Sequence, residues 1–546
     1  MVLHFPLLAR PLTKTDAGLA AARPPDEPAP LVTDAEIERI LEETRHGGHE
    51  VERGRQIFVN RNLRLDQIEL IGFDMDYTLA IYHLRRIEAL SYEMTVGRLI
   101  AKKGYPESLR ALKYDHDFVI RGLVVDKQRG NLFKVDRHNH VGRCYHGRRA
   151  LTDDERRAIY RNEKISLRPP RYAVIDTLFS LPEACLYVDV IELFEREGRE
   201  VDFVRLYDDI RESIDEVHRD NSLKTELKKD LGHYIVRDPE LGPALHKLRS
   251  GGKKTFLLTN SLWDYTDAVM KYLFDGLLPE YPSWRNYFDY VIVGAQKPGF
   301  FSEKHPLVEL DAAGEPVGEA RGLERGRVYQ GGNLGDLEHF AGIGGERVLY
   351  VGDHIYGDII RNRKVSLWRT CMVVQELETE IAYTEGNAGA LTRLRELERL
   401  RAKLDDELNH HKLILNQLDR RSDKAKAAPA DPTEDDASDG RSVPAGGGGE
   451  VPHPIDAERR REKACLEKLR RALRSVVAEA EAIEAGFERG SNASWGLVFK
   501  EGNENSRFGD QVEDYACLYT SRASNFLHYS PMQYFRSPRD VMPHEP

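Results

Sequence analysis

The sequence predicts an α/β protein built around a parallel β-sheet, with an inserted α+β cap domain and a C-terminal helical hairpin arm. Four short apolar runs lack polar alternation, which is typical of parallel strands covered on both faces. About 180 residues separate the first run from the second, far more than a strand crossover needs. Two long amphipathic segments flank a stretch rich in proline, glycine and acidic residues, which indicates two helices joined by a linker.

The composition limits which kinds of binding partner and which cellular location are expected for this protein. The 546 residues are 40% hydrophobic and 31% charged, with a net charge of −11 and the two signs mixed along the chain. A concentrated basic face is therefore not expected, and with it no nucleic-acid partner. Five scattered cysteines form no CxxC or Cys/His cluster, which argues against a disulfide framework and a structural zinc. Because no 18-residue apolar stretch or signal peptide occurs, we expect no membrane partner and a cytoplasmic location.

The four apolar runs define the expected sheet domain. They are QIELIGF (67–73), KTFLLTN (254–260), FDYVIVG (288–294) and RVLYVGD (347–353). We expect the core domain over 33–84 and 240–385 and the inserted cap domain over 85–239. The first 32 residues end in a stretch rich in alanine and proline, which predicts a disordered arm over 1–32.

The pattern after residue 385 predicts a helical hairpin over 386–420 and 455–488, with a disordered linker over 421–454. The apolar positions expected in its seam are Leu394, Leu397, Leu400, Leu404, Leu408, Leu466, Leu469, Leu473, Val476, Ala480 and Ile483. Such a coiled-coil pair can serve packing within one chain or an oligomer contact, so homo-oligomerisation is left open. The aromatic-rich segment 489–546 is expected to pack on the core.

Two acids stand where the first apolar run ends. In IGFDMDYTLA, Asp74 and Asp76 lie two positions apart, so their side chains point to the same side of an extended backbone. Solvated acids at a strand end are the plain interpretation of this motif alone. However, parallel sheets build ligand sites at the carboxyl ends of their strands. One acid could then attack a phosphorus atom while the other handles the proton of the leaving group.

The other strand ends supply groups that such chemistry needs. Small hydrogen-bonding side chains end the second run, a lysine follows the third, and two acids suited to Mg²⁺ follow the fourth. In chain order these are Thr259, Asn260, Ser261, Lys297, Asp353 and Asp358. An acid pair, a hydroxyl, a lysine and a second acid pair, all at strand ends, together indicate phosphoryl chemistry.

This ordered set resembles the haloacid dehalogenase superfamily of phosphohydrolases, and most closely its cytosolic purine 5′-nucleotidase family. The motifs that carry the resemblance are DMDYT (74–78), IDTLFSLPE (175–183), TNS (259–261), KPGFF (297–301), VYQGG (328–332) and GDHIYGD (352–358), with the ending QYFRSPRDVMPHE. The resemblance implies a Rossmann-like core and hydrolysis through an aspartyl-phosphate intermediate, with phosphotransferase activity open through the same intermediate.

The resemblance also implies residue roles. Asp74 would be the nucleophile and Asp76 the general acid and base. Mg²⁺ would be held by Asp74, the main-chain carbonyl of Asp76, and Asp353, with Asp358 assisting. The phosphate would be bound by Thr259, Asn260, Ser261 and Lys297, and Lys297 would also serve catalysis.

Purine nucleoside monophosphates, with IMP and GMP preferred, are the substrates that the resemblance implies. The residues matching the family's substrate positions are Phe179, Arg211, Asp215, His218 and Lys224. The plain interpretation of Phe179 is a core aromatic, and that of Arg211 and Asp215 is a surface ion pair. The residues matching effector positions are Tyr356, Lys364, Gln511 and Tyr515, while Asp514 departs from the arginine of vertebrate members.

Two alternative functions stay open. The chain could be a related phosphatase acting on a phosphate monoester that is not a nucleotide. It could also be a non-catalytic scaffold that uses the helical hairpin for assembly. The presence of Arg211 and Asp215 weighs against the first, and the presence of every motif aspartate weighs against the second.

Overall fold

The computed structural model describes residues 51–163, 165, 170–427 and 454–538. Apart from Val51, all of them belong to one compact unit, Glu52–Pro546. The expected N-terminal arm and most of the expected linker lie outside the described residues. No described helix is long and apolar enough to cross a membrane.

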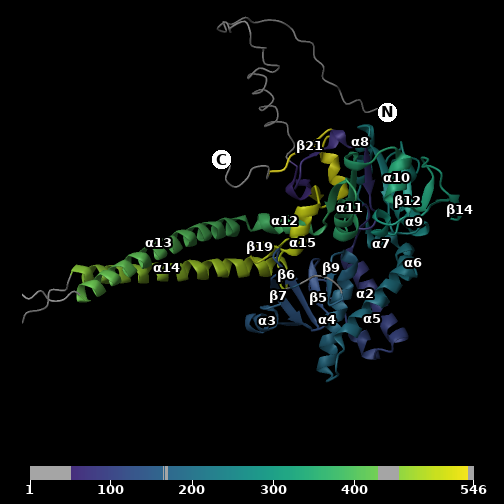
Figure 1. Ribbon diagram of the computed structural model, residues 1–546. Coiled ribbons are helices and arrows are strands. Elements are labelled where there is room, and N and C mark those ends of the chain that lie inside the picture. The colour runs from purple at the N-terminus through teal and green to yellow at the C-terminus, as the bar shows by residue number, and fades with distance from the viewer. Residues whose placement is uncertain (1–50, 164, 166–169, 428–453, 539–546) are drawn as a thin grey trace, which may run out of the picture. The chain divides into compact units, whose positions relative to one another are not determined.

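A ten-stranded sheet forms the core (Figure 1), which confirms the predicted α/β fold class. In spatial order its strands are β1 (Phe58–Val59), β20 (Leu518–Thr520), β17 (Arg369–Val373), β16 (Val348–Gly352), β3 (Leu70–Phe73), β11 (Lys254–Leu258), β12 (Tyr290–Val293), β15 (Val328–Gly331), β13 (Leu307–Leu310) and β14 (Pro316–Glu319). From β20 to β15 every neighbouring pair is parallel, whereas β1, β13 and β14 pair antiparallel at the edges. The four predicted strands are β16, β3, β11 and β12, consecutive in the middle of the sheet.

Burial explains why these four runs lack polar alternation. Every residue of β3, β12 and β16 is buried, and β11 is buried after its first residue. Side chains on both faces are therefore covered, and both faces must be apolar. Gly72 in β3 is required by packing, because a Cβ there would lie 2.1 Å from the Phe256 ring of β11. Strands β3 and β11 can then pair in register, with Phe73 opposite Leu257. On its other side β3 pairs with β16, where Phe73 lies opposite Val351.

Helices connect and cover the strands of this sheet (Figure 1). They are α8 (Leu241–Ser250), α9 (Trp263–Phe274), α10 (Leu334–Ala341), α11 (Arg361–Val365), α12 (Glu376–Gly386) and α15 (Arg507–Tyr515). In α9 the buried residues Tyr265, Val269 and Leu273 recur every four positions, which places one apolar face against the core.

The inserted segment folds around its own antiparallel sheet, in the order β8-β7-β6-β5-β9. These strands are Arg149–Ala150, Val141–His146, Asn131–Val135, Leu123–Asp126 and Tyr172–Ile175. Its helices are α2 (Leu84–Lys103), α3 (Asp153–Tyr160), α4 (Leu181–Arg196), α5 (Phe203–Arg219), α6 (Ser222–Lys229) and α7 (Leu231–Tyr234). Two short strands, β4 (Ile81–Tyr82) and β10 (Ile235–Val236), pair antiparallel where the chain leaves and re-enters the core.

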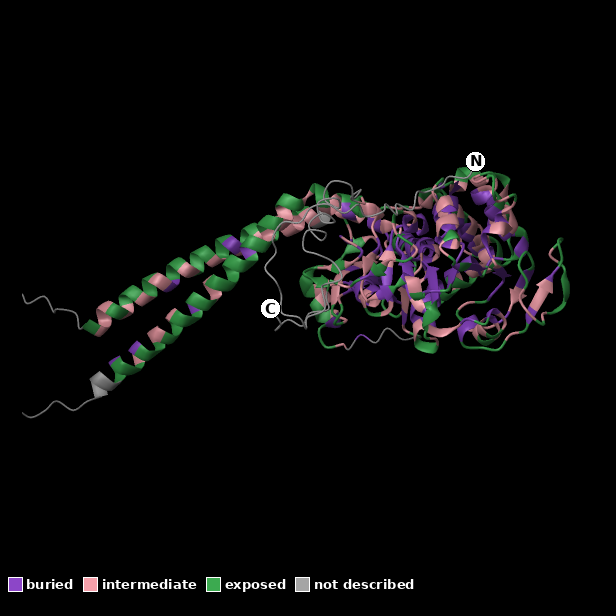
Figure 2. Ribbon diagram, turned by 90° about the horizontal axis from the view of Figure 1, so that it is seen from above, coloured by how far each residue is buried: buried purple, intermediate pink, exposed green. Residues whose placement is uncertain are grey.

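Two long helices, α13 (Ala388–Ala427) and α14 (Pro454–Ser491), pack against each other (Figure 1). The ion pairs Arg393–Glu479 and Asp419–Arg459 join residues whose order is reversed on the two helices, so the pair is antiparallel, as predicted. Helix α13 continues seven residues past 420, into the stretch expected to be linker. Figure 2 shows few buried residues along this pair compared with the sheet region.

The seam of the helix pair differs from the prediction at Leu400. Leu397, Leu408 and Leu466 are buried as expected, whereas Leu400 is 44% exposed. Leu418, which the prediction did not include, is buried. Seven-residue steps from the buried Leu397 reach Leu404 and the buried Leu418, and the buried Leu408 follows Leu404 by four residues. Leu400 follows Leu397 by only three residues and lies on the flank of this stripe.

The C-terminal segment joins the core through several short elements. Strand β20 pairs with β17 and β1, and β21 (Tyr534–Phe535) pairs with β2 (Leu63–Arg64). The short 3-10 helix η9 (Ala523–His528) contacts α8, and β18 (Lys500–Glu501) pairs with β19 (Glu504–Asn505). The backbone hydrogen bonds of β17 therefore depend on a strand far along the chain.

Candidate functional site

Asp74 is the first residue after β3. Its backbone amide donates to the carbonyl of Val351 at 2.9 Å, which extends the pairing of β3 with β16 by one residue. The carboxylate then accepts the amide of Met75 at 2.7 Å and is buried. The backbone thus fixes Asp74 at the carboxyl end of the central strand.

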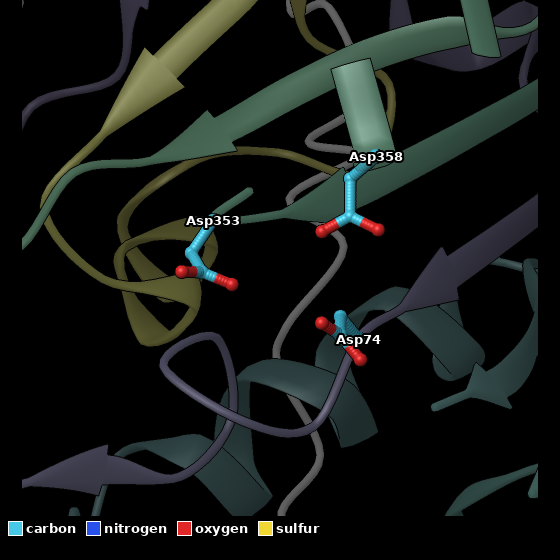
Figure 3. A group of neighbouring side chains, drawn as sticks. All are labelled: Asp74, Asp353 and Asp358. Atoms are coloured by element: carbon cyan, nitrogen blue, oxygen red, sulfur yellow. The ribbon is translucent and has the colours of Figure 1, made fainter. Parts of the chain in front are cut away.

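Three carboxylates converge at this edge of the sheet. Asp74, Asp353 and Asp358 each offer an oxygen, and these oxygens lie within 4.8 Å of one another (Figure 3). Asp353 follows β16, and Asp358 lies in the short helix η8 (Ile355–Ile360). Gly352 makes room for this approach, because a Cβ at that position would lie 2.5 Å from Oδ2 of Asp358. Sequence-distant acids are therefore brought together by two neighbouring strand ends.

Lys297 enters the same group from the loop after β12. Its Nζ lies 2.9 Å from Oδ1 of Asp74 and 2.8 Å from Oδ1 of Asp358, and it donates to the Tyr350 hydroxyl at 2.9 Å. The side chain of Asn260 holds the lysine's backbone, accepting from its amide at 2.6 Å and donating to its carbonyl at 2.9 Å. Asn260 therefore positions Lys297 as well as lying at the site itself.

One lysine faces three buried carboxylates, so negative charge is in excess. Burial and the neighbouring acids raise the pKa of Asp74 to about 7, against the opposing effect of Lys297. The same causes raise the pKa of Asp353 well above its ordinary value. Oδ2 of Asp353 is buried and has no hydrogen-bond partner among the described residues. An all-oxygen donor set with excess negative charge and an open oxygen fits a hard divalent cation such as Mg²⁺.

Asp76 is not part of this acid group and has its own hydrogen-bond partners. Its Oδ1 accepts the Tyr82 hydroxyl at 2.5 Å, and its Oδ2 accepts the Ser261 hydroxyl at 2.6 Å. Tyr82 and Tyr265 share a hydrogen bond of 2.8 Å, and Lys224 of the inserted domain donates to Ser261 at 3.1 Å. Thr259 is fully buried, and its hydroxyl accepts the amide of Ser261 at 3.1 Å. Asp76 is therefore linked to the cap through Ser261, which Lys224 contacts.

A cavity of about 260 Å³, here called the Asp76 cavity, opens between the two domains. The core contributes Asp76, Asn260 and Ser261 to its wall. All five predicted substrate residues of the cap also line it: Phe179, Arg211, Asp215, His218 and Lys224. Aromatic and charged side chains of the cap therefore share this cavity with Asp76, the candidate general acid and base.

Aromatic rings form one side of the Asp76 cavity. The Phe179 ring packs edge-on against Tyr77 and His218, with centroids 4.6 Å and 5.2 Å apart. Burial, with Lys224 and Arg211 nearby, lowers the pKa of His218 to about 4, so its imidazole is neutral at pH 7. The buried Nε2 of His218 has no hydrogen-bond partner in the part of the chain that the structure describes.

Arg211 is held by two acids rather than one. Its Nη1 lies 2.7 Å from Oε2 of Glu183, whose side chain is fully buried, and its Nε lies 3.3 Å from Oδ2 of Asp215. The predicted ion pair is present, but the shorter contact is with Glu183. Burying a carboxylate is costly unless it is paired, so Glu183 and Arg211 stabilise each other.

The four predicted effector residues lie on three elements, of which η8 contacts both α11 and α15. Tyr356 is in η8 and Lys364 in α11, while Gln511 and Tyr515 are in α15, which packs against η8. Lys364 places its Nζ 5.7 Å from the centroid of the Tyr515 ring, and Tyr356 is 46% exposed. An effector role for these residues stays a prediction.

Several residues of the site were missed from the sequence. Tyr82 and Glu183 bond to the predicted site residues Asp76 and Arg211, and Tyr350 bonds to Lys297. The ring of Tyr265 lies 5.3 Å from the Nζ of Lys224. Arg121 is fully buried, pairs with Glu376 and donates to the carbonyl of Asp353 at 3.1 Å. Glu183 ends the motif IDTLFSLPE, but its contact with Arg211 is not visible in the sequence. The tyrosines resemble other buried tyrosines, and the partner of Arg121 lies 255 positions away.

Comparison with known proteins identifies relatives over most of the chain. A sequence model of the 5′ nucleotidase family matches residues 57–546. A 5′-nucleotidase domain-containing protein of Dictyostelium discoideum is 34% identical over 339 residues, which cover 60% of this chain and 56% of that protein. The proteins named 5′-nucleotidase domain-containing protein 2 of Rattus norvegicus and Homo sapiens are 36% and 35% identical over 341 residues. Those matches cover 60% of this chain and 60% and 64% of the relatives.

The chain therefore spans less than two thirds of the length of these curated relatives. Among solved structures, CbbY from Rhodobacter sphaeroides in complex with phosphate is 13% identical, with a TM-score of 0.22. That match covers 56% of this chain and 86% of CbbY. It is too weak to bear on the fold or the function.

Proposed function

The chain belongs to the 5′ nucleotidase family, and from this premise we propose that it hydrolyses purine nucleoside 5′-monophosphates in a Mg²⁺-dependent reaction. The proposal rests on one observation: the acid group around Asp74 and the Asp76 cavity meet at the carboxyl end of β3. Asp74 lies among Asp353, Asp358 and Lys297, and Asp76, two residues on, opens into a cavity walled by aromatic and charged side chains.

In the proposed reaction, Asp74 attacks the phosphorus atom and the bond from phosphorus to the 5′-oxygen breaks. Asp76 gives its proton to the departing 5′-oxygen, so the nucleoside leaves as an alcohol. Water then attacks the aspartyl-phosphate while Asp76 takes up its proton, which releases phosphate and restores Asp74. An acceptor alcohol in place of water would give phosphotransferase activity through the same intermediate.

The surrounding residues orient these groups. Tyr82 and Ser261 fix both carboxylate oxygens of Asp76, and Asn260 fixes the backbone that carries Lys297. Asp74 and Asp353, the main-chain carbonyl of Asp76, and Asp358 would hold the Mg²⁺. When bound, the ion supplies positive charge that offsets the repulsion between the Asp74 carboxylate and the substrate phosphate. Thr259, Asn260 and Lys297 would bind the phosphate.

The cap would select the base. A 6-oxopurine presents an acceptor at O6 and a donor at N1, which suit the guanidinium of Arg211 and the carboxylate of Asp215. Adenine reverses both groups, and a mismatched polar edge costs about 1–3 kcal/mol. IMP and GMP should therefore be preferred to AMP by roughly 10–100-fold in kcat/KM. A cytoplasmic location, as expected from the composition, would give access to these nucleotides.

A phosphate-release screen with the full chain and Mg²⁺ tests the proposal. We expect release from IMP and GMP that EDTA abolishes, and much slower release from non-nucleotide monoesters such as sugar phosphates. Faster release from a non-nucleotide monoester would favour the alternative phosphatase function. A lack of release from every monophosphate would favour a non-catalytic scaffold.

The base-selection part has its own test. Asp215→Ala should lower the ratio of IMP to AMP kcat/KM, whereas Glu212→Ala, an exposed position on the same helix, should leave it unchanged. Equal kcat/KM for IMP and AMP in the wild type, or an unchanged ratio in Asp215→Ala, would show that these residues do not select the base.

A further inference from the structure

A second cavity, of about 440 Å³, lies between the cap and the core and is here called the Glu88 cavity. Its wall combines residues of the cap, of α12, of the segment 491–498 and Arg522. Tyr82 borders both this cavity and the Asp76 cavity, but the two have no other residue of their walls in common. The proposed hydrolysis uses none of the remaining residues of the Glu88 cavity.

Glu88 is the buried acid of this cavity. It lies in α2, is only 3% exposed, and accepts the Tyr114 hydroxyl on Oε2 at 3.0 Å. Its Oε1 is buried and has no hydrogen-bond partner among the described residues. Burial raises the pKa of Glu88 to about 7. A carboxylate in this position is costly unless a partner reaches it.

The arginines of the cavity wall are already paired with other acids. Arg522 makes two hydrogen bonds to Glu378, the longer of them 2.8 Å, and Arg85 lies 3.3 Å from Asp117. Glu376, also in the wall, is held by the buried Arg121 at 2.5 Å. Within the described part of the chain, these pairs leave Glu88 without an arginine or lysine partner.

Glu380 adds a second acid without a matching cation. One of its oxygens accepts the amide of Phe499 at 3.4 Å, and the buried Oε2 has no partner among the residues that the structure describes. The nearby Lys134 directs its Nζ to the carbonyls of Trp495 and Leu497. Burial raises the pKa of Glu380 to about 7. The Glu88 cavity therefore holds two acidic groups beyond those its arginines balance.

Apolar side chains make up the rest of the wall. They are Leu84, Val119, Ile120, Leu178, Leu181 and Val498. A hydrated inorganic cation gains nothing from such surface, whereas the methylene chain of an organic amine does, at about 25 cal/mol per Å² buried. An ammonium group would pair with the carboxylate of Glu88, whose buried Oε1 has no partner among the described residues, while its chain packs on the leucines.

We propose that the Glu88 cavity binds an aliphatic polyamine, with one ammonium group on Glu88 and a second toward Glu380. The cavity volume, the unpartnered buried oxygen of Glu88 and the apolar wall each favour this class of ligand.

Isothermal titration of the full chain with spermidine at pH 8 and physiological salt tests the proposal. We expect saturable binding with a 1:1 stoichiometry, and at least about tenfold weaker binding in Glu88→Gln, which keeps the shape and removes the charge. Glu93→Gln changes an exposed residue of the same helix and should leave the affinity unchanged. Titrations with KCl and MgCl₂ test whether an inorganic cation binds the cavity instead.

Glu380→Gln provides a second variant, with the same expectation of weaker spermidine binding, should Glu88→Gln not fold. Affinity that is unchanged in both variants would overturn the proposal, since it would reflect attraction to the acidic surface of a chain with net charge −11. So would no saturable binding by the wild type, or an inorganic cation that binds Glu88 and displaces spermidine completely.

Discussion

Tyr82 and Ser261 hold the two oxygens of Asp76, and this arrangement leads to a prediction about proton transfer. Tyr82→Phe removes the hydroxyl and keeps the ring. A hydrogen bond to a charged group contributes about 1.5–3 kcal/mol, so we expect kcat to fall roughly 10–100-fold with little change in KM. Steady-state phosphate release measures both constants.

Tyr105→Phe is the matched control for that substitution. It removes another hydroxyl–carboxylate bond, to Asp209 at 3.0 Å, on the surface of the cap. Its kcat should match the wild type. If Tyr82→Phe also keeps the wild-type kcat, then Tyr82 does not position the general acid and base.

His218 leads to a prediction of pH dependence. Burial, with Lys224 and Arg211 nearby, lowers its pKa from 6.5 to about 4. Below pH 6.5 the unfolded chain takes up a proton here that the folded chain does not, so stability from this group is complete above pH 6.5 and is lost as the pH falls toward 4. His218→Gln should therefore flatten the fall in the thermal unfolding midpoint over this range. His138→Gln, an exposed control, should not, and equal slopes for wild type and His218→Gln would contradict the shift.

A site residue could be predicted where a local sequence pattern marks it. Asp74, Asp76, Asp353 and Lys297 follow apolar strands, so a local pattern marks each of them. Glu183 ends the motif IDTLFSLPE, but its role shows only in its contact with Arg211, 28 positions away. Arg121 is marked only by its contact with Glu376, 255 positions away. Side-chain pairing over such separations is fixed by tertiary packing, which one sequence does not display.

At the scale of elements, strands were predictable where burial on both faces removes polar residues. The β17 sequence RTCMV begins with two polar residues and so carries only a short apolar run, and its neighbour β20 comes from the distant C-terminal segment. The edge strand β14 is exposed throughout and carries no apolar run. Seam position Leu400 was wrong because the leucine repeat alone does not distinguish the seam from its flank.

The helix pair offers a test of its seam. Leu408 is 6% exposed in α13, whereas Leu413 on the same helix is 58% exposed. Leu408→Ala should destabilise the pair by about 2–5 kcal/mol, because it leaves a cavity between the helices. Hydrogen exchange of the amides of α13 and α14 should become faster in that variant. Leu413→Ala should exchange like the wild type, and equal protection in both variants would place Leu408 outside the seam.

At the scale of the whole molecule, the function proposed here depends on an insertion. The core alone supplies Asp74, Lys297 and Asp353, while every predicted base-selecting residue is in the segment between β4 and β10. Sequence reasoning predicted the insertion from the spacing of the strands, and the paired β4 and β10 bring its two ends together. The size of the Asp76 cavity and the existence of the Glu88 cavity were not predictable, since both depend on how the two domains face each other.

Phosphorylation of Asp74 is the most direct test of the central claim. The full chain is mixed with IMP and Mg²⁺, quenched in acid during turnover, digested and analysed by mass spectrometry. The proposed reaction predicts a phosphoryl group on the peptide that contains Asp74, and neither this group nor phosphate release in a folded Asp74→Asn variant. Near-normal phosphate release by Asp74→Asn, or turnover with the phosphoryl group on another residue, would contradict it.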